Sequence, residues 1–141
     1  ENSRSAVYKD FAHSPSKLKA TSTAMKEQFE NRQLVACMEL HTFSSLNEDF
    51  LKQYEGCMDA PDTAYVFFSP KALAHKKLPD ISADQVHQAF GRDDLKVFTS
   101  SQELISALKS EKWENQNLLL MSSGNFEGVD FNDLATEILQ K

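Results

Sequence analysis

The chain has 141 residues, of which 40% are hydrophobic and 26% are charged, a composition typical of one globular domain. A formal net charge of −6, with no basic run that offsets it, argues against nucleic acid or an anionic membrane surface as the main partner. No apolar segment approaches the roughly 20 residues of a membrane span, and no signal peptide is recognisable, so we expect a cytoplasmic protein. The chain begins with Glu1 rather than Met and a strand follows almost at once, so we expect a domain cut from a longer chain.

The first predicted strand, residues 5–12, leads into a helix that begins at Ser14. Ser14 suits the N-cap and Pro15 the first helical position, where a missing N–H costs nothing. Such a junction directs backbone N–H groups and the positive end of a helix dipole toward a phosphate or carboxylate. Asp10 could accept hydrogen bonds from a ribose, and His13 could donate or titrate near neutral pH. Ordinary helix capping also explains these residue types, so the stretch alone does not define a site.

The following elements alternate between helix and strand. Further strands are predicted over residues 34–38, 64–68, 96–99 and 117–121, and further helices begin at Ser45, Ser82, Ser100 and Asp130. The partners Glu48, Gln85 and Glu103 cap three of these helices, and Gly91 ends one. A short basic segment, 71–78, interrupts this alternation of helices and strands. The apolar helix faces are made by Leu18, Met25 and Phe29; Phe50, Leu51, Tyr54 and Met58; Val86 and Phe90; Leu104, Ile105 and Leu108; and Leu134 and Ile138.

The two cysteines carry little functional signal. Cys37 falls in a predicted apolar strand and Cys57 in a predicted helix, and neither has neighbours at metal-ligand spacing. We therefore predict two buried free thiols rather than a disulfide or a metal site.

The alternation predicts an α/β fold with an open, mostly parallel, Rossmann-like sheet and helices on both faces. Ligands of such sheets bind outside the carboxyl ends of the strands. Three polar segments are expected there: 10–14, 39–45 and 122–128. A single loop histidine or asparagine is usually incidental, but His13, His41 and Asn125 at one edge together favour a site.

Several chemistries lack their motifs. The sequence has no Gly-x-Gly-x-x-Gly after the first strand, no Gly-Lys-Ser/Thr phosphate loop, no zinc-type histidine spacing and no Ser-His-acid set. Catalysis would therefore need groups from outside this chain.

Three motifs carry a family resemblance: 10–15 (Asp-Phe-Ala-His-Ser-Pro), 39–42 (Glu-Leu-His-Thr) and 121–128 (Met-Ser-Ser-Gly-Asn-Phe-Glu-Gly). Together they resemble the C-terminal domain of Mur ligases over essentially the whole chain. The first motif is widespread in that family, whereas the last is more specific to its recycling branch, the murein peptide ligases.

The resemblance implies that residues 1–141 form the C-terminal domain of a three-domain, ATP-dependent ligase. In the recycling branch, UDP-N-acetylmuramate is joined to the tripeptide L-alanyl-γ-D-glutamyl-meso-diaminopimelate through an acyl phosphate. ATP and Mg²⁺ would be bound mainly by an upstream central domain, and the isolated domain is expected to be inactive.

By position, the resemblance assigns nucleotide contacts to Asp10, His13 and Ser14. It assigns contacts with the incoming substrate to His41, Thr42, Ser44, Ser122, Ser123, Gly124, Asn125 and Phe126, partly through backbone N–H groups. The domain would contribute positioning and charge stabilisation rather than a nucleophile.

The second motif departs from the family. Recycling ligases carry Pro-Arg after the Glu, and the L-alanine-adding relatives carry Pro-His followed by Arg, whereas 39–45 here contains no Arg. His or Ser cannot replace the bidentate clamp of Arg on a carboxylate. The acceptor is therefore open between the tripeptide and L-alanine, and a non-catalytic nucleotide- or peptide-binding module is a further alternative.

Overall fold

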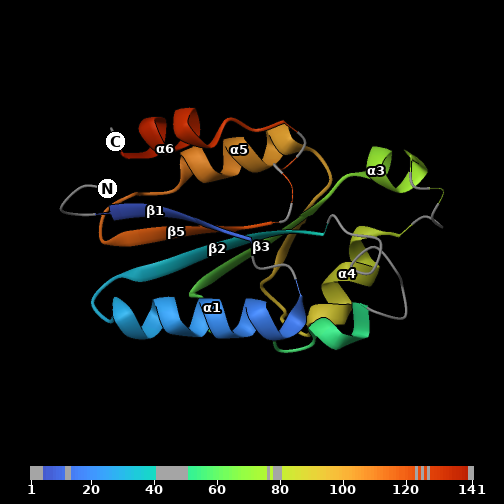
Figure 1. Cartoon of the computed structure of the whole chain (residues 1–141), viewed down its shortest axis with the longest axis horizontal. Helices are drawn as coiled ribbons and strands as arrows, with labels where there is room; N and C mark the ends of the chain where they lie inside the picture. Colours follow the sequence, from blue (N-terminus) through green and yellow to red (C-terminus); the bar gives the residue numbers. More distant parts are fainter. Residues whose placement is uncertain are drawn as a thin grey trace.

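A five-stranded, all-parallel sheet forms the centre of the molecule, with helices on both faces (Figure 1). The computed structural model describes residues 5–11, 14–40, 51–75, 77, 81–122, 124, 126 and 128–139. The strands are β1 (Ser5–Asp10), β2 (Gln33–Leu40), β3 (Thr63–Phe68), β4 (Lys96–Phe98) and β5 (Gln116–Met121). Their order in the sheet is β1-β5-β2-β3-β4. The predicted Rossmann-like fold class is confirmed.

The helices of the described residues divide between the two faces. They are α1 (Pro15–Gln28), the 3-10 helix η1 (Lys52–Tyr54), α3 (Pro70–His75), α4 (Ala83–Phe90), α5 (Ser101–Ser110) and α6 (Phe131–Leu139). Figure 1 shows α1 and α4 on one face of the sheet and α5 and α6 on the other. No helix in the described ranges is long and apolar enough to cross a membrane.

Two hydrophobic cores lie on opposite faces of the sheet, because successive strand residues point to opposite sides. In β2, Leu34, Ala36, Met38 and Leu40 pack into one core, and Val35 and Cys37 into the other. The first core is completed mainly by Leu18, Leu51, Tyr54, Met58, Val86 and Phe90, and the second by Leu104, Leu108, Leu134 and Ile138. The continuous apolar runs of the sequence thus reflect burial on both faces.

Local capping chemistry behaves largely as predicted. Ser82 and Gln85 form a complete capping box, with the Gln85 N–H donating to Ser82 Oγ (3.1 Å) and the Ser82 N–H donating to Gln85 Oε1 (2.8 Å). Gly91 ends α4 with φ of 67°, the left-handed conformation that suits glycine. Ser14 occupies the N-cap of α1 ahead of Pro15, but its side chain makes no capping hydrogen bond.

Two strand ends differ from the predictions by two residues, and the other strand boundaries differ by at most one. β1 ends at Asp10 rather than at residue 12. Glu39 and Leu40 belong to β2 rather than to the following loop, since they pair with Phe67 and Phe68 of β3. Pairing with β3 therefore extends β2 through Glu39, although a charged side chain after an apolar run is more typical of a turn.

The helix predicted from Ser45 to Met58 is too long in its described part. Leu51 is helical, but residues 52–58 form only the short η1 and following turns, so Cys57 lies in a turn. Gly56 has φ of 78°, and its N–H donates to the Phe90 carbonyl of α4 (3.2 Å) instead of continuing a helix. The predicted Ser45–Glu48 cap lies outside the described residues.

Candidate functional site

The carboxyl ends of β1, β5 and β2 lie side by side, because β5 runs parallel between the other two strands. Met121 of β5 is in register with Asp10 of β1 and with Met38 of β2. The next residues along, Ser122 and Glu39, therefore lie at the same edge. The Ser122 N–H donates to the Asp10 carbonyl at 3.0 Å. The described parts of all three predicted polar segments are thus brought together.

A buried carboxylate organises this edge. Glu39 is 2% exposed, and its Oε1 accepts hydrogen bonds from the Ser122 hydroxyl (2.6 Å) and from the Phe126 N–H (3.0 Å). Ser122 Oγ in turn accepts from the Gly124 N–H at 2.7 Å. We call these four residues the Glu39 network. A buried carboxylate is tolerated only where hydrogen-bond donors surround it, as they do here.

Phe126 fixes the far end of the Glu39 network. Its ring is 2% exposed and lies between Phe67 of β3 and Phe131 of α6, with centroid separations of 6.0 and 5.9 Å. Its φ of 53° is unusual for a non-glycine residue. The hydrogen bond to Glu39 and the aromatic contacts hold this conformation in place.

The predicted site residues have different surroundings. Asp10 is exposed at the end of β1 and Ser14 is half-buried at the start of α1, whereas Ser122 and Phe126 are buried. Gly124 is half-buried. The other six predicted residues lie outside the described residues: His13, His41, Thr42, Ser44, Ser123 and Asn125.

The backbone donors of the loop after β5 have acceptors within the chain. The N–H groups of Ser122, Gly124 and Phe126 donate to Asp10, Ser122 and Glu39 respectively. Sequence reasoning expected these groups to hold the incoming substrate. In the observed geometry these three hydrogen bonds shape the described part of the loop, and contact of its backbone with a substrate stays a prediction.

Sequence reasoning did not include Glu39 among the site residues. The available signal was a lone acidic residue closing an apolar strand, 34–38, where an apolar side chain would pack more easily. The same carboxylate lies near the Cys37 thiol, whose pKa is raised by burial and by the charge of Glu39. Cys37 and Cys57 are both free and buried, as predicted.

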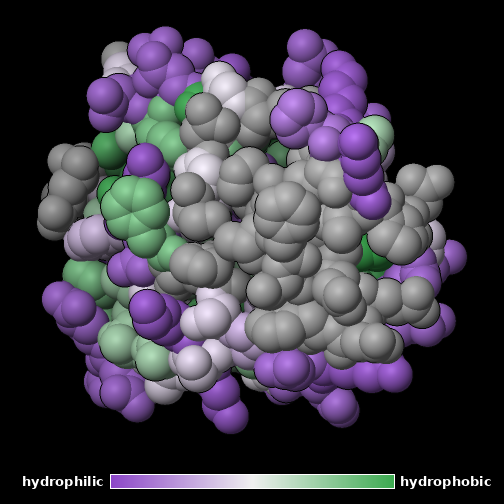
Figure 2. Space-filling view, turned by 45° about the vertical axis from the view of Figure 1, so that its right-hand side comes forward, coloured by the Kyte–Doolittle hydropathy of each residue, from purple (hydrophilic) through white to green (hydrophobic). Residues whose placement is uncertain are grey.

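An exposed aromatic side chain borders the edge. Phe11 is 70% exposed, and the Lys9 ammonium lies 5.6 Å from its ring and 4.4 Å from the ring of Phe131. These contacts link the end of β1 to the start of α6. Figure 2 shows a face of the molecule with a largely hydrophilic rim and hydrophobic side chains gathered toward its left-hand side.

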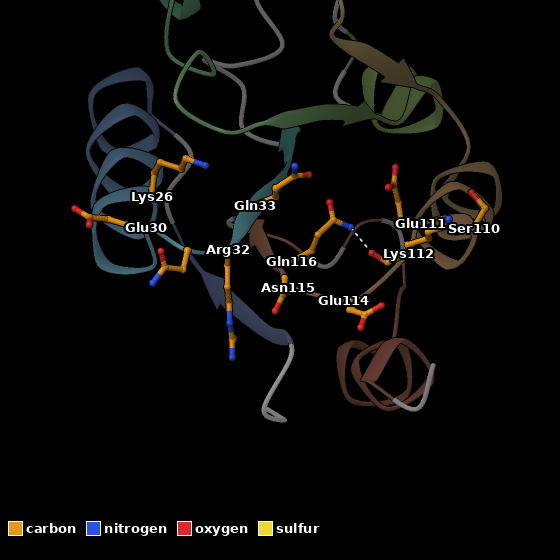
Figure 3. Close-up of a pocket in the computed structure, with 11 residues that line it drawn as sticks. Lys26, Glu30, Arg32, Gln33, Ser110, Glu111, Lys112, Glu114, Asn115 and Gln116 are labelled. Carbon is orange, nitrogen blue, oxygen red and sulfur yellow. Dashed lines mark hydrogen bonds between the residues drawn. The ribbon is translucent and has the colours of Figure 1, made fainter.

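Two cavities lie at opposite edges of the sheet. One of about 440 Å³ extends the carboxyl edge and is lined by 69–71 after β3 and 99–102 after β4. The other, of about 660 Å³, lies where β2 and β5 begin (Figure 3). Its lining mixes acidic and basic side chains, and the Gln116 amide donates to the Lys112 carbonyl across it at 2.6 Å. Within the described residues, no group of three or more His, Cys, Asp or Glu could hold a metal ion.

Comparison with known sequences relates nearly the whole chain to one class of enzyme. No family model matches it. UDP-N-acetylmuramate–L-alanine ligases of Chlorobium chlorochromatii and Pelodictyon phaeoclathratiforme are 29% and 30% identical to it over 137 residues. Each alignment covers 94% of this chain, which spans 28% and 27% of the length of those relatives.

Solved structures reproduce the same unit. A murein peptide ligase of Psychrobacter arcticus matches with a TM-score of 0.71 and 20% identity, over 94% of this chain and 27% of that one. A domain of a putative UDP-N-acetylmuramate:tripeptide ligase of Haemophilus ducreyi matches with a TM-score of 0.62 and 20% identity, over 94% of this chain and 89% of that one. The chain is a Mur ligase C-terminal domain. A further match is the Thermotoga maritima UDP-N-acetylmuramate–alanine ligase, with a TM-score of 0.58 and 18% identity, over 95% of this Mur ligase domain and 26% of that chain.

Proposed function

We propose that this Mur ligase domain works in an ATP-dependent ligase that joins the carboxylate of UDP-N-acetylmuramate to an amine. The observation that carries the proposal is that sequence similarity to UDP-N-acetylmuramate–L-alanine ligases extends over 94% of the chain. The convergence of three polar strand ends on one edge supports it, because open α/β sheets bind ligands there.

In the proposed reaction, ATP converts the sugar's carboxylate to an acyl phosphate, and the amine of the acceptor then displaces the phosphate to form the amide. The chain's own share is to bind and orient. The exposed Asp10 carboxylate is suited to accepting hydrogen bonds from ribose hydroxyls, and the start of α1 at Ser14 and Pro15 is suited to a phosphate. A solved MurF ligase structure with ADP, at a TM-score of 0.54, supports a nucleotide role for this family. We assign most contacts with Mg²⁺ and the phosphates to domains outside this sequence.

For the acceptor, we propose the murein tripeptide first. The 121–128 motif resembles the recycling branch. Structures named for murein peptide ligation match at TM-scores of 0.71 and 0.62, against 0.58 for the alanine ligase. L-Alanine is the second candidate, and the sequence relatives described above, which are named for L-alanine, favour it. A non-catalytic nucleotide- or peptide-binding module is the third.

The deciding experiment is an amide-ligation assay on the complete protein that carries this domain. Purified enzyme is given UDP-N-acetylmuramate and ATP with either the tripeptide or L-alanine, and product is followed by mass spectrometry. Turnover with the tripeptide alone supports the first proposal, and turnover with L-alanine alone supports the second. Absence of turnover with both acceptors, in a protein that contains a Gly-Lys-Ser/Thr loop upstream, would contradict the ligase assignment. The 141-residue chain by itself is expected to produce nothing.

A further inference from the structure

We propose that Glu39 is a positioning residue that fixes the loop after β5 to the end of β2, and so holds the acceptor side of the site in place. The kinetic part of this inference rests on the proposed function. The structural part concerns only this chain.

One carboxylate oxygen ties two points of the loop. Glu39 Oε1 accepts from the Ser122 hydroxyl at 2.6 Å and from the Phe126 N–H at 3.0 Å, so both ends of the span 122–126 depend on it. Hydrogen bonds to an ionised acceptor are shorter and stronger than neutral ones. Because the Ser122 N–H also donates to the Asp10 carbonyl, the Glu39 network joins the ends of β1, β5 and β2.

Stability alone does not account for a carboxylate at this position. β2 is buried on both faces, and an apolar side chain could continue its run of Leu34 to Met38. Replacing a buried ionic group by an apolar one is often neutral or stabilising, so such groups are weak evidence for stability. What Glu39 contributes is a defined position for Ser122 and Phe126, and this is the property that an acceptor site requires.

The structural part is tested by NMR on the 141-residue chain. Glu39→Leu removes the acceptor, so hydrogen exchange of the Phe126 amide should accelerate by about 10-fold or more. Glu39→Gln keeps a carbonyl acceptor without the charge, so the Phe126 amide proton should move upfield while its protection is largely retained. Ser122→Ala offers a second route, since it frees the Gly124 N–H and removes one donor to Glu39.

Tyr65→Phe is the matched control. It removes a hydroxyl-to-carboxylate hydrogen bond of the same 2.6 Å length, between Tyr65 and Glu111, and should leave the Phe126 amide unchanged. If Glu39→Leu and Ser122→Ala both leave the Phe126 and Gly124 amides as in the parent chain, the anchoring role is overturned.

The kinetic part uses the complete ligase with the same variants. Glu39→Leu should raise KM for the acceptor by about 10- to 100-fold and leave KM for ATP nearly unchanged, as expected for a group that orients binding residues. Glu39→Gln should restore most of the acceptor affinity. A merely structural role would lower the active fraction, and hence kcat, without raising the acceptor KM.

The outcomes separate the two proposals. Unchanged acceptor KM in an active Glu39→Leu ligase refutes the positioning role, even where the NMR changes occur. A parent ligase inactive with every acceptor refutes the proposed function instead, and the NMR result then decides whether Glu39 anchors the loop.

Discussion

The phenol of Tyr65 donates a 2.6 Å hydrogen bond to the carboxylate of Glu111, although 46 residues separate them in sequence. Burial raises the pKa of Tyr65, and the hydrogen bond to Glu111 raises it further. We expect Tyr65 to remain protonated above pH 10 as long as the domain is folded, and phenolate absorbance at 295 nm should show this late-titrating group disappear in Tyr65→Phe.

The same shift predicts a pH effect on stability. The pKa of Tyr65 is raised above its unfolded value of 10.0. The contribution of Tyr65 to the free energy of unfolding is therefore fully present below pH 10 and is lost as the pH rises toward the folded-state pKa. The free energy of unfolding should therefore decline less steeply above pH 10 in Tyr65→Phe than in the parent. Parallel alkaline declines in urea titrations of both proteins would contradict the shift.

Asp62 links α1, β2 and the turn before β3. Its Oδ2 accepts from the Leu34 N–H at 2.7 Å and from the Lys26 ammonium. Burial alone raises the pKa of Asp62, but these hydrogen bonds and the charge of Lys26 outweigh it, so the pKa is lowered from 3.8. The stabilisation of the fold by the Asp62 carboxylate is therefore present above about pH 4 and is lost as the pH falls through the lowered pKa.

We expect Asp62→Asn to destabilise the domain at pH 7 by about 1 kcal/mol, since the ion pair is half-exposed and screened by solvent. The difference from the parent should shrink toward pH 2, measured by urea unfolding at each pH. A difference that stays constant from pH 7 to pH 2 would assign the effect to packing.

Arg92 holds the chain between η1 and β3. Its guanidinium donates to the carbonyls of Met58 (2.7 Å), Pro61 (2.7 Å) and Asp62 (2.9 Å). Arg92→Ala leaves these carbonyls without that donor and should lower the free energy of unfolding by about 2–3 kcal/mol. Arg92→Lys should recover only a minor part, because an ammonium cannot reproduce the planar fork.

Thermal and urea unfolding measure the Arg92 effect, and Lys17→Ala on an exposed face of α1 is the control for loss of a positive charge. Full recovery of the free energy of unfolding in Arg92→Lys would show that the positive charge, rather than the planar fork of the guanidinium, stabilises this part of the chain.

Both thiols should be unreactive in the folded domain. Cys37 is fully buried and Cys57 is 6% exposed, and burial raises the pKa of each thiol. Ellman's reagent should label neither at pH 8 within minutes, and both after unfolding in urea. The Cys57→Ser variant identifies which thiol is responsible if labelling of the native chain occurs.

Much of the fold can be predicted from the sequence, because it depends on interactions between residues that are close in the chain. The apolar runs of β2, β3 and β5 and the capping box of Ser82 and Gln85 depend on neighbouring residues, so pattern reasoning finds them. The helix predicted through Cys57 fails because Gly56 bonds to Phe90, 34 residues away, a contact that periodicity cannot indicate. Glu39 extends β2 for the same kind of reason, because its pairing partner Phe67 lies on another strand.

The candidate site was predictable in place but not in detail. Strand alternation alone puts the segments around Asp10, Glu39 and Ser122 at one edge. Which donors face inward depends on the backbone path after β5, including the left-handed Phe126. The family resemblance assigned Ser122 and Phe126 to ligand binding, and the structure adds that the Ser122 hydroxyl and the Phe126 N–H donate to Glu39. Their direct contact with substrate stays a prediction.

The central place of β5 governs the order in which the domain can assemble. In the sheet, β5 lies between β1 and β2. Therefore β1 cannot join the other strands until residues 116–121 are present. Pairings across such long stretches of chain form slowly. During synthesis, β2, β3 and β4 can therefore associate early, while β1 waits for β5 to emerge from the ribosome. The edge that carries Asp10 and Glu39 is consequently completed only after β5 has joined the sheet.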